Sequence, residues 1–285
     1  KWLKNDRRQC ADSTRRHICS LGLTATPLRR IESETYKLLH QIFSRKEQGP
    51  SYSSLIEKRK LVRPIHYAPR STDISSGALC TVAAMEVAAR LWHKHCKGRR
   101  TIAFCSTIDQ SEHFVATMIN VGINAAHIGS SKWSATSGQH EKVPMPPDEC
   151  DDTLRHFKKG EIEVLSSAGM LSEGFDDPGV GAIIFMHRVH ESVIKYIQQL
   201  GRGLRGNEGK KSCIVIDMAA NCRRFCIFTA AEKTQWHEVH DISFEDEKTI
   251  MLPVENVSDQ CDTTREDELP QEVNRRTLRQ PGYRR

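Results

Sequence analysis

The chain has 285 residues, a formal net charge of +6 at pH 7 and an apolar fraction of 38%. Its length suits one large or two modest domains, and the low apolar fraction indicates that part of it is linker or tail. The mild positive charge permits a polyanionic partner without demanding one. No apolar run approaches the roughly 20 residues of a membrane span, and the first residues lack the apolar core of a secretory signal. These features exclude a membrane-spanning protein.

Ten cysteines are scattered along the chain without any Cys-x-x-Cys pair. The tightest candidates for metal binding, His93-x-His95-Cys96 and Cys222-x-x-x-Cys226, have no matching second pair. Free cysteine packs as a small buried apolar residue in reducing compartments. The sequence therefore predicts no metal site and an intracellular, thiol-reduced protein, and it does not distinguish nucleus, mitochondrion and cytoplasm.

The first part of the chain predicts a strand, helical segments and an extended segment. A charged start leads into a short apolar strand that ends at Leu23. Residues 31–43 have apolar side chains at the spacing of an amphipathic helix. Residues 53–60 predict one or two helical turns, and residues 61–67 a short extended segment. Residues 68–77 are rich in Ser, Pro and Thr, so they are the best candidate for a linker.

After this linker the chain alternates helices with short apolar strands. The helices are expected at residues 78–95, 109–121, 151–159 and 192–200, and the strands at 101–105, 123–128, 162–166, 181–186 and 213–217. Asp109 or Ser111 is placed to cap the second helix, and Gly160 is placed to end the third. Residues 129–147 are polar and rich in proline, which predicts a loop of unusual length.

Beyond about residue 230 the apolar residues thin out and clusters of like charge follow. A short strand is expected at residues 239–244, and disorder at residues 255–285. The basic end of the chain is suited either to contact with phosphates or to plain solvation.

Short apolar strands that alternate with helices predict an α/β fold with a parallel sheet covered by helices on both faces. In such a sheet, ligands normally bind in the loops at the carboxyl ends of the strands. The segment that follows the expected strand at residues 162–166 falls at that edge.

Three stretches of the chain suggest its chemistry. In chain order they are Leu21-Gly-Leu-Thr-Ala-Thr-Pro27, Leu171-Ser-Glu-Gly-Phe-Asp176 and Gln198-x-x-Gly201-Arg202-x-x-Arg205. Arginines are always charged and fork-shaped, so two of them three residues apart suit binding the oxygens of a polyphosphate from one side. A solvated basic helix end is the plain alternative. Together and in this order, the stretches resemble motifs III, V and VI of the superfamily-two helicases, nucleic-acid motors with two RecA-like lobes.

The last stretch also matches a second pattern, the dinucleotide-binding fingerprint, at Gly201-x-Gly203-x-x-Gly206. That fingerprint requires a strand before it and a helix after it. Here the preceding residues 192–200 have the apolar spacing of a helix, and the following residues 206–211 predict a turn. The dinucleotide-binding interpretation is therefore rejected.

The resemblance implies a division into four parts. These are the C-terminal end of a first RecA-like lobe at residues 1–67, a linker at 68–77, a second RecA-like lobe at 78–228 and a charged, largely disordered tail at 229–285. The spelling of the three motifs looks closer to the DNA-acting branch of the family, so DNA is favoured over RNA as the partner. The N-terminal RecA-like lobe is the other expected partner.

The resemblance also assigns roles around ATP. The catalytic side chains would be Gln198, Arg202 and Arg205, and Arg205 would be the arginine finger that meets charge developing on the transferred phosphoryl group. The ATP-binding positions would be Gly174, Asp176 and Gly201. Asp176 would hydrogen-bond the ribose or orient the arginines, and its plain alternative is a turn cap before a proline.

Nucleic acid would be contacted mainly along its phosphate backbone, by the hydroxyls of Ser106, Ser166 and Ser167. A serine that ends a strand is as often a helix cap, so both interpretations stay open. The chain has Ala168-Gly169 where the family frequently has Thr-Asp, which leaves the contacts of this motif uncertain.

Thr24, Ala25 and Thr26 in the first stretch would couple the two lobes. The chain has no Gly-x-x-x-x-Gly-Lys-[Ser/Thr] phosphate loop and no Asp-Glu-x-His or Asp-Glu-Ala-Asp box, and Gly209-Lys210-Lys211 is the nearest approach to the phosphate loop. The Mg ligands are therefore expected in a missing N-terminal lobe, and this chain alone is expected not to hydrolyse ATP. The competing interpretation is a catalytically inactive RecA-like lobe that serves as a binding or scaffold module.

Overall fold

The computed structural model describes residues 2–4, 21–23, 45–47, 49–136, 139–172, 175–189, 193–225, 238–242 and 250–251. Near the start of the chain, three short strands form an antiparallel sheet in the order β2-β1-β3: β1 Trp2–Lys4, β2 Leu21–Leu23 and β3 Arg45–Glu47. Several expectations lie outside the described residues. They are Thr24, Ala25 and Thr26, Gly174, the helix at 31–43 and the disorder at 255–285.

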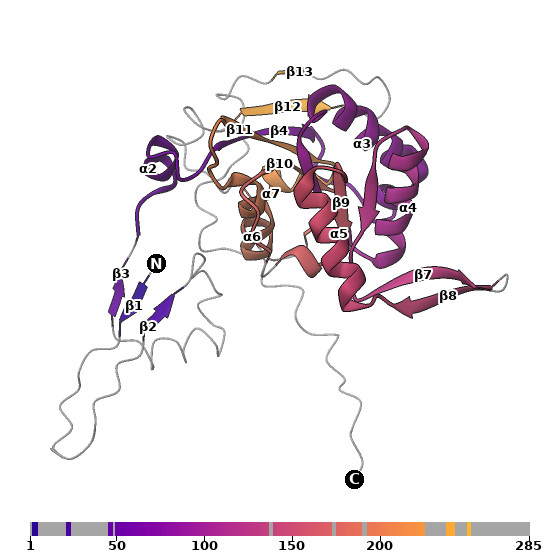
Figure 1. Cartoon of the computed structure of the whole chain (residues 1–285). Helices are drawn as coiled ribbons and strands as arrows, with labels where there is room; N and C mark the ends of the chain where they lie inside the picture. The colour runs from indigo at the N-terminus through magenta and orange to yellow at the C-terminus, as the bar shows by residue number, and fades with distance from the viewer. Residues whose placement is uncertain are drawn as a thin grey trace, which may run out of the picture.

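The main body is one eight-stranded sheet in the order β13-β12-β4-β11-β10-β5-β9-β6, in which only the pair β12–β13 is antiparallel (Figure 1). Its strands are β4 Arg63–Pro69, β5 Arg100–Phe104, β6 Ala125–His127, β9 Val164–Ser167, β10 Val180–Phe185, β11 Ser212–Asp217, β12 Glu238–Ile242 and β13 Ile250–Met251. The helices are α2 Tyr52–Glu57, α3 Val82–His95, α4 Ile108–Asn120, α5 Pro147–Lys159, α6 Val193–Leu204 and α7 Asn221–Phe225, with single 3-10 turns at Ala78–Cys80 and Met170–Ser172. The predicted α/β fold with a parallel sheet covered on both faces is confirmed.

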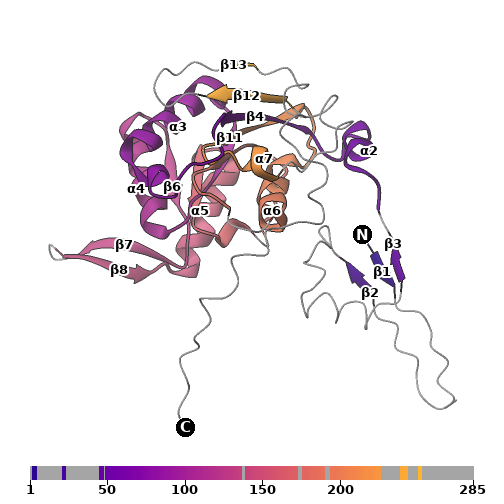
Figure 2. The ribbon, with the colours of Figure 1, turned by 180° about the vertical axis from the view of Figure 1, so that it is seen from behind.

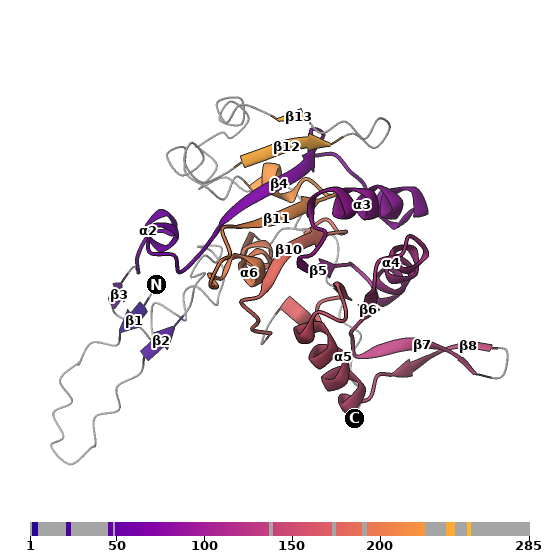
Figure 3. The ribbon, with the colours of Figure 1, turned by 45° about the horizontal axis from the view of Figure 1, so that its top comes forward.

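The two faces of the sheet have separate cores because side chains alternate along each strand. Along β10, Ala182 and Ile184 join the core that contains Trp92 of α3, whereas Ile183 and Phe185 join the core of α5 and α6. Figure 3 shows α3 and α4 on one side of the sheet and α6 on the other. Strands covered on both faces have continuous apolar sequences, and β10 is buried at every position.

Strand β4 lies inside this sheet, between β11 and β12. Its register pairs Arg63 with Ser212 on one side and Ile65 with Glu238 on the other, both in parallel. Residues 68–77 are expected to form a linker, but β4 continues to Pro69, and the residues after it lead directly to the 3-10 turn at Ala78–Cys80. An extended segment does not reveal from its own sequence which strands it will pair with. The short strand expected at residues 239–244 is present as β12.

Residues 129–147 are not one long loop, so that expectation was wrong. They contain an antiparallel hairpin of β7 Ser131–Thr136 and β8 Gln139–Pro144, which extends away from the body of the sheet (Figures 1 and 2). The base of the hairpin contacts two helices: the Trp133 backbone N–H donates to Glu112 of α4, and Lys132 pairs with Glu149 of α5. A hairpin that covers no core needs no apolar alternation, so the strand pattern was missing.

No helix within the described ranges is both long and apolar enough to cross a membrane.

Candidate functional site

Helix α6 and the segment before β10 place the candidate residues at two opposite edges of the sheet. The strand β10 leads into α6, which runs back, so that Arg202 and Arg205 lie near the edge where β10 and β11 begin. Residues 168–179 connect the end of β9 to the start of β10, and they therefore pass from the carboxyl edge to the amino edge. The arginines and the serines Ser106, Ser166 and Ser167 thus mark opposite ends of the fold, which the sequence analysis did not anticipate.

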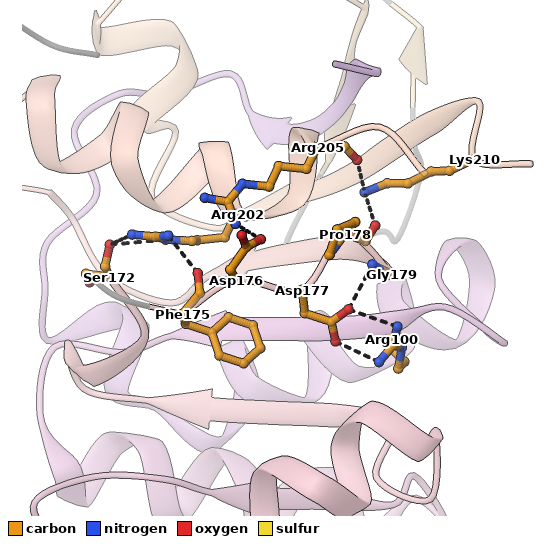
Figure 4. Close-up of polar contacts among 10 residues, drawn as sticks. All are labelled: Arg100, Ser172, Phe175, Asp176, Asp177, Pro178, Gly179, Arg202, Arg205 and Lys210. Atoms are coloured by element: carbon orange, nitrogen blue, oxygen red, sulfur yellow. Dashed lines mark hydrogen bonds and ion pairs between the residues drawn. The ribbon is translucent and has the colours of Figure 1, made fainter. Parts of the chain in front are cut away.

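Arg202 is bound to the backbone of this connecting segment. Its Nη2 and Nε donate to the carbonyl oxygen of Ser172 at 2.7 and 3.2 Å, and its Nη1 donates to the carbonyl oxygen of Phe175 at 2.6 Å (Figure 4). The neighbouring Gln199, which is buried, donates to the Ser172 hydroxyl at 3.0 Å. The guanidinium group therefore donates to internal acceptors, which fix the side chain.

Arg205 lies one turn further along α6 and is in a different situation. Its Nη1 pairs with the carboxylate of Asp176, and the two side chains are 36% and 67% exposed (Figure 4). An ion pair this exposed contributes little to stability, because water screens both charges. Arg205 is thus held by a weak and accessible partner. Gln198, the third residue expected to be catalytic, is half-buried on the same helix.

Asp177, next to Asp176, makes the strongest ion pair of the site. Its carboxylate binds Arg100 in a bidentate manner at 2.7 and 3.1 Å and accepts the Gly179 backbone N–H at 2.9 Å (Figure 4). Arg100 begins β5, and its guanidinium also lies 5.7 Å from the centroid of the Phe157 ring. Only tertiary structure brings these residues together, so sequence reasoning missed them. The sequence Asp-Asp-Pro at residues 176–178 indicates a turn, but it does not indicate that Arg100 pairs with Asp177.

The glycines of the rejected dinucleotide fingerprint have packing reasons of their own. A Cβ on Gly203 would lie 2.5 Å from Cys213 Sγ and 2.7 Å from Ile183 Cγ1, so a side chain there would separate α6 from the sheet. A Cβ on Gly201 would have nothing within 4 Å among the described residues. Gly201 directly precedes Arg202 in the last turn of α6.

We expect Gly203→Ala and Gly201→Ala to change stability in opposite directions. Overpacking at Gly203 should cost about 1–3 kcal/mol of unfolding free energy, because both neighbouring atoms belong to buried side chains. Gly201→Ala should gain about 0.5–1 kcal/mol, because alanine loses less backbone entropy in a helix. Urea denaturation of the chain measures both. Equal stability of the two variants would contradict the close packing at Gly203.

At the carboxyl edge, Ser106 is exposed directly after β5. Its hydroxyl and its backbone N–H both donate to Oε1 of the buried Gln110, at 2.8 and 2.7 Å. Gln110 Nε2 in turn donates to the carbonyl oxygens of Leu79 and Met186. Thr107 caps α4, so the expected caps Asp109 and Ser111 were wrong. Gln110 therefore fixes the loop that presents Ser106.

Ser166 and Ser167 have fully buried side chains. The Ser166 hydroxyl lies 2.7 Å from the Ser111 hydroxyl, which lies 2.7 Å from His127 Nδ1. Burial lowers the pKa of His127, so the neutral ring at the centre of this network is favoured. The Ser167 hydroxyl is buried without a hydrogen-bond partner among the residues described. Neither side chain is at the surface, so contact with nucleic acid through these two hydroxyls stays a prediction that their burial does not favour.

Comparison with known proteins matches residues 83–207 to the family described as "Helicase conserved C-terminal domain". The match includes both arginines, the connecting segment and the strands β5, β6, β9 and β10. Residues 83–207 therefore correspond to the C-terminal domain of a superfamily-two helicase.

Several relatives of this helicase domain are known. A 51.5 kDa protein of Lactococcus phage (isolate 7-9) is 26% identical over 215 residues, which are 70% of this chain and 43% of that protein. IRC3 of Saccharomyces cerevisiae, named as an ATP-dependent helicase, is 41% identical over 112 residues, which are 38% of this chain and 16% of that protein. The chain thus spans less than half the length of these curated relatives. The solved C-terminal domain of the DEAD-box protein Dbp5 is 17% identical with a TM-score of 0.45, covering 66% of this chain and 93% of that one.

The side chains of the helicase domain suit a phosphate better than a metal ion. Arg205 is a half-exposed cation beside an open helix surface, which is the chemistry that a polyphosphate requires. No group of three or more His, Cys, Asp or Glu side chains in the described part of the chain is placed to hold a metal ion.

Proposed function

We propose that this chain is the C-terminal part of an ATP-dependent nucleic-acid helicase or translocase, and that it supplies Arg205 to an ATP site completed by a first RecA-like lobe. The observation that carries the proposal is the difference between the two arginines of α6. Arg202 is bound to internal carbonyls, whereas Arg205 is half-exposed and, among the described residues, pairs with the exposed carboxylate of Asp176.

The electrostatics support this division of roles. A terminal phosphate carries more charge than one carboxylate, and it accepts two parallel N–H bonds from a guanidinium. Arg205 would exchange its weak contact with Asp176 for the phosphate when the lobes close, at little cost. Asp176 would then be released to bind the ribose. Arg202, with Gln199, would keep the connecting segment in place while Arg205 moves.

The connecting segment also suggests how ATP and nucleic acid would be coupled. It begins after Ser166 and Ser167 at the carboxyl edge and reaches Asp176, beside Arg205, shortly before β10 starts. A shift of α6 on ATP binding would therefore move the backbone at the opposite edge, because Arg202 binds two carbonyls of this segment. At that edge, the exposed Ser106 and the backbone after β9 would contact phosphates of the nucleic acid. DNA is favoured as the partner by the spelling of the three motifs.

We expect the chain to bind single-stranded DNA weakly, with little sequence preference and with an affinity that falls steeply with salt. Contacts to phosphates release counterions, so the affinity should fall as the salt concentration rises. In a plot of the logarithm of the binding constant against the logarithm of the salt concentration, each phosphate contact should contribute about −0.7 to the slope. Fluorescence anisotropy with labelled oligonucleotides between 50 and 300 mM salt would measure this slope, with RNA of the same sequence as the comparison. A salt-independent affinity, or a strong preference for one sequence, would contradict the proposed contacts.

The turnover experiment that tests the proposal joins this chain to a first lobe that has a phosphate loop. Such a two-lobe protein should hydrolyse ATP, and its turnover should depend on Arg205. A two-lobe protein that binds nucleic acid but never turns over ATP would favour the scaffold interpretation instead.

A further inference from the structure

Lys210 lies in the turn between α6 and β11, and its ammonium group reaches four backbone carbonyl oxygens. Two of them, of Gly203 and Arg205, lie at 2.7 and 2.9 Å and belong to the end of α6. The other two, of Pro178 and Val180, belong to the start of β10, with Pro178 at 3.2 Å. Figure 4 shows the contacts to Arg205 and Pro178. One side chain therefore connects two segments that are about 25 residues apart in the sequence.

The chemistry of these contacts explains why they are favourable. The last carbonyls of a helix have no partner within the helix, and they form the negative end of its dipole. An ammonium group has three N–H donors, which Lys210 shares among the four carbonyls. Burial lowers the pKa of Lys210, because an ammonium loses hydration there. The carbonyls replace that lost water.

The two connected segments are those that carry Arg205 and its partner. Pro178 follows Asp176 by two residues, and Arg205 itself provides one of the four carbonyls. Lys210 thus fixes the distance between the backbone of the arginine and the backbone of the carboxylate. Without it, the end of α6 and the start of β10 would lose the polar contacts that the Lys210 ammonium makes to both of them.

The backbone after Arg205 is supported from its other side as well. Leu61 forms an isolated β-bridge with Arg205, and the Gly206 N–H donates to the Lys60 carbonyl at 3.0 Å. A Cβ on Gly206 would overlap the Arg59 carbonyl oxygen, so this approach requires glycine. Arg205 therefore projects from a backbone position that is fixed on both sides, although its own side chain is half-exposed.

The neighbouring Lys211 gives a contrast. It is exposed, whereas Lys210 is partly buried with its donors directed at carbonyls. The sequence Gly209-Lys210-Lys211 resembles a fragment of a phosphate loop, yet the Lys210 ammonium has backbone acceptors in place of a phosphate.

We propose that Lys210 is a positioning residue for Arg205, which it holds at the correct place for phosphoryl transfer by joining the end of α6 to the start of β10. This inference rests on the proposed role of Arg205. It predicts that Lys210 acts on the chemical step, through Arg205, with little effect on ATP binding.

The test is a double-mutant cycle on ATP turnover by the two-lobe protein, with Lys210→Met, Arg205→Ala and the double variant. We expect Lys210→Met to lower kcat about tenfold and to change the KM for ATP less than twofold. In the Arg205→Ala background, Lys210→Met should lower kcat less than twofold further, because residues that act as one unit are not additive. Lys211→Met is the matched control and should leave kcat unchanged.

The outcomes separate this inference from the proposed function. If Arg205→Ala alone leaves kcat near normal, the proposed function fails. If Arg205→Ala lowers kcat but Lys210→Met does not, or if Lys210→Met lowers it equally in both backgrounds, the positioning role is overturned. If Lys210→Met does not fold, as judged by its thermal unfolding, Lys210→Arg takes its place in the same cycle. That variant keeps the positive charge but replaces the ammonium group by a planar guanidinium group, which does not reproduce the same contacts. Its kcat should therefore fall when Arg205 is present and should not fall further in the Arg205→Ala background.

Discussion

Arg205→Ala in the two-lobe protein is expected to lower kcat for ATP at least tenfold and to change the KM for ATP by less than about threefold. An arginine finger meets charge that develops in the transition state, so its loss falls on the chemical step and not on ground-state binding. Fingers in related phosphoryl-transfer enzymes contribute about 10³–10⁵ in rate, so tenfold is a cautious threshold. Steady-state kinetics with saturating DNA would measure both constants.

Two variants serve as controls for this experiment. Arg205→Lys should recover little of the lost rate, because a point charge cannot replace the planar fork. Arg155→Ala removes an arginine on the exposed face of α5, where it pairs with Asp152, and it should leave kcat unchanged. Near-normal stimulated turnover by Arg205→Ala would show that Arg205 is only a solvated helix end, and the site assignment would then be wrong.

The second large effect is expected at the pair of Arg100 and Asp177. Arg100→Met should lower the unfolding free energy of the chain by about 2–4 kcal/mol, because it leaves the Asp177 carboxylate buried without its cation. The side chains are 22% and 8% exposed, so the loss should be somewhat smaller than for a fully buried pair. Guanidinium or urea denaturation at low salt would measure the change. The methionine keeps the apolar packing against the Phe157 ring.

The surface pair of Arg155 and Asp152 provides the matched control. It has a similar N···O distance of 2.7 Å, but its side chains are 58% and 57% exposed. Arg155→Met should therefore change the unfolding free energy by less than about 0.5 kcal/mol. If Arg100→Met had an effect no larger than this control, the carboxylate of Asp177 would have another partner or would stay hydrated. The turn at Asp176 and Pro178 would then not be fixed by the ion pair of Arg100 and Asp177.

The sequence alone determined the fold class and the identity of the motifs. Strands such as Val180–Phe185 are apolar at every position, and helices with amphipathic spacing separate them, so a parallel sheet covered on both faces follows from periodicity. Gly160 also ended α5 as expected, with a φ of +82°. Glycine adopts this left-handed conformation without the steric cost that other residues meet. These features depend on a residue and its near neighbours.

Tertiary structure decided the division of roles among the charged residues. Arg202 and Arg205 are both arginines of one motif, so the sequence gives no reason to expect different contacts for them. One binds internal carbonyls and the other an exposed carboxylate, because only the fold places Ser172, Phe175 and Asp176 beside α6. The same holds for Arg100 and Asp177, which are 77 residues apart in the sequence. Ion pairs and carbonyl contacts between distant segments have no local periodicity, since their partners are selected by the packing of whole elements.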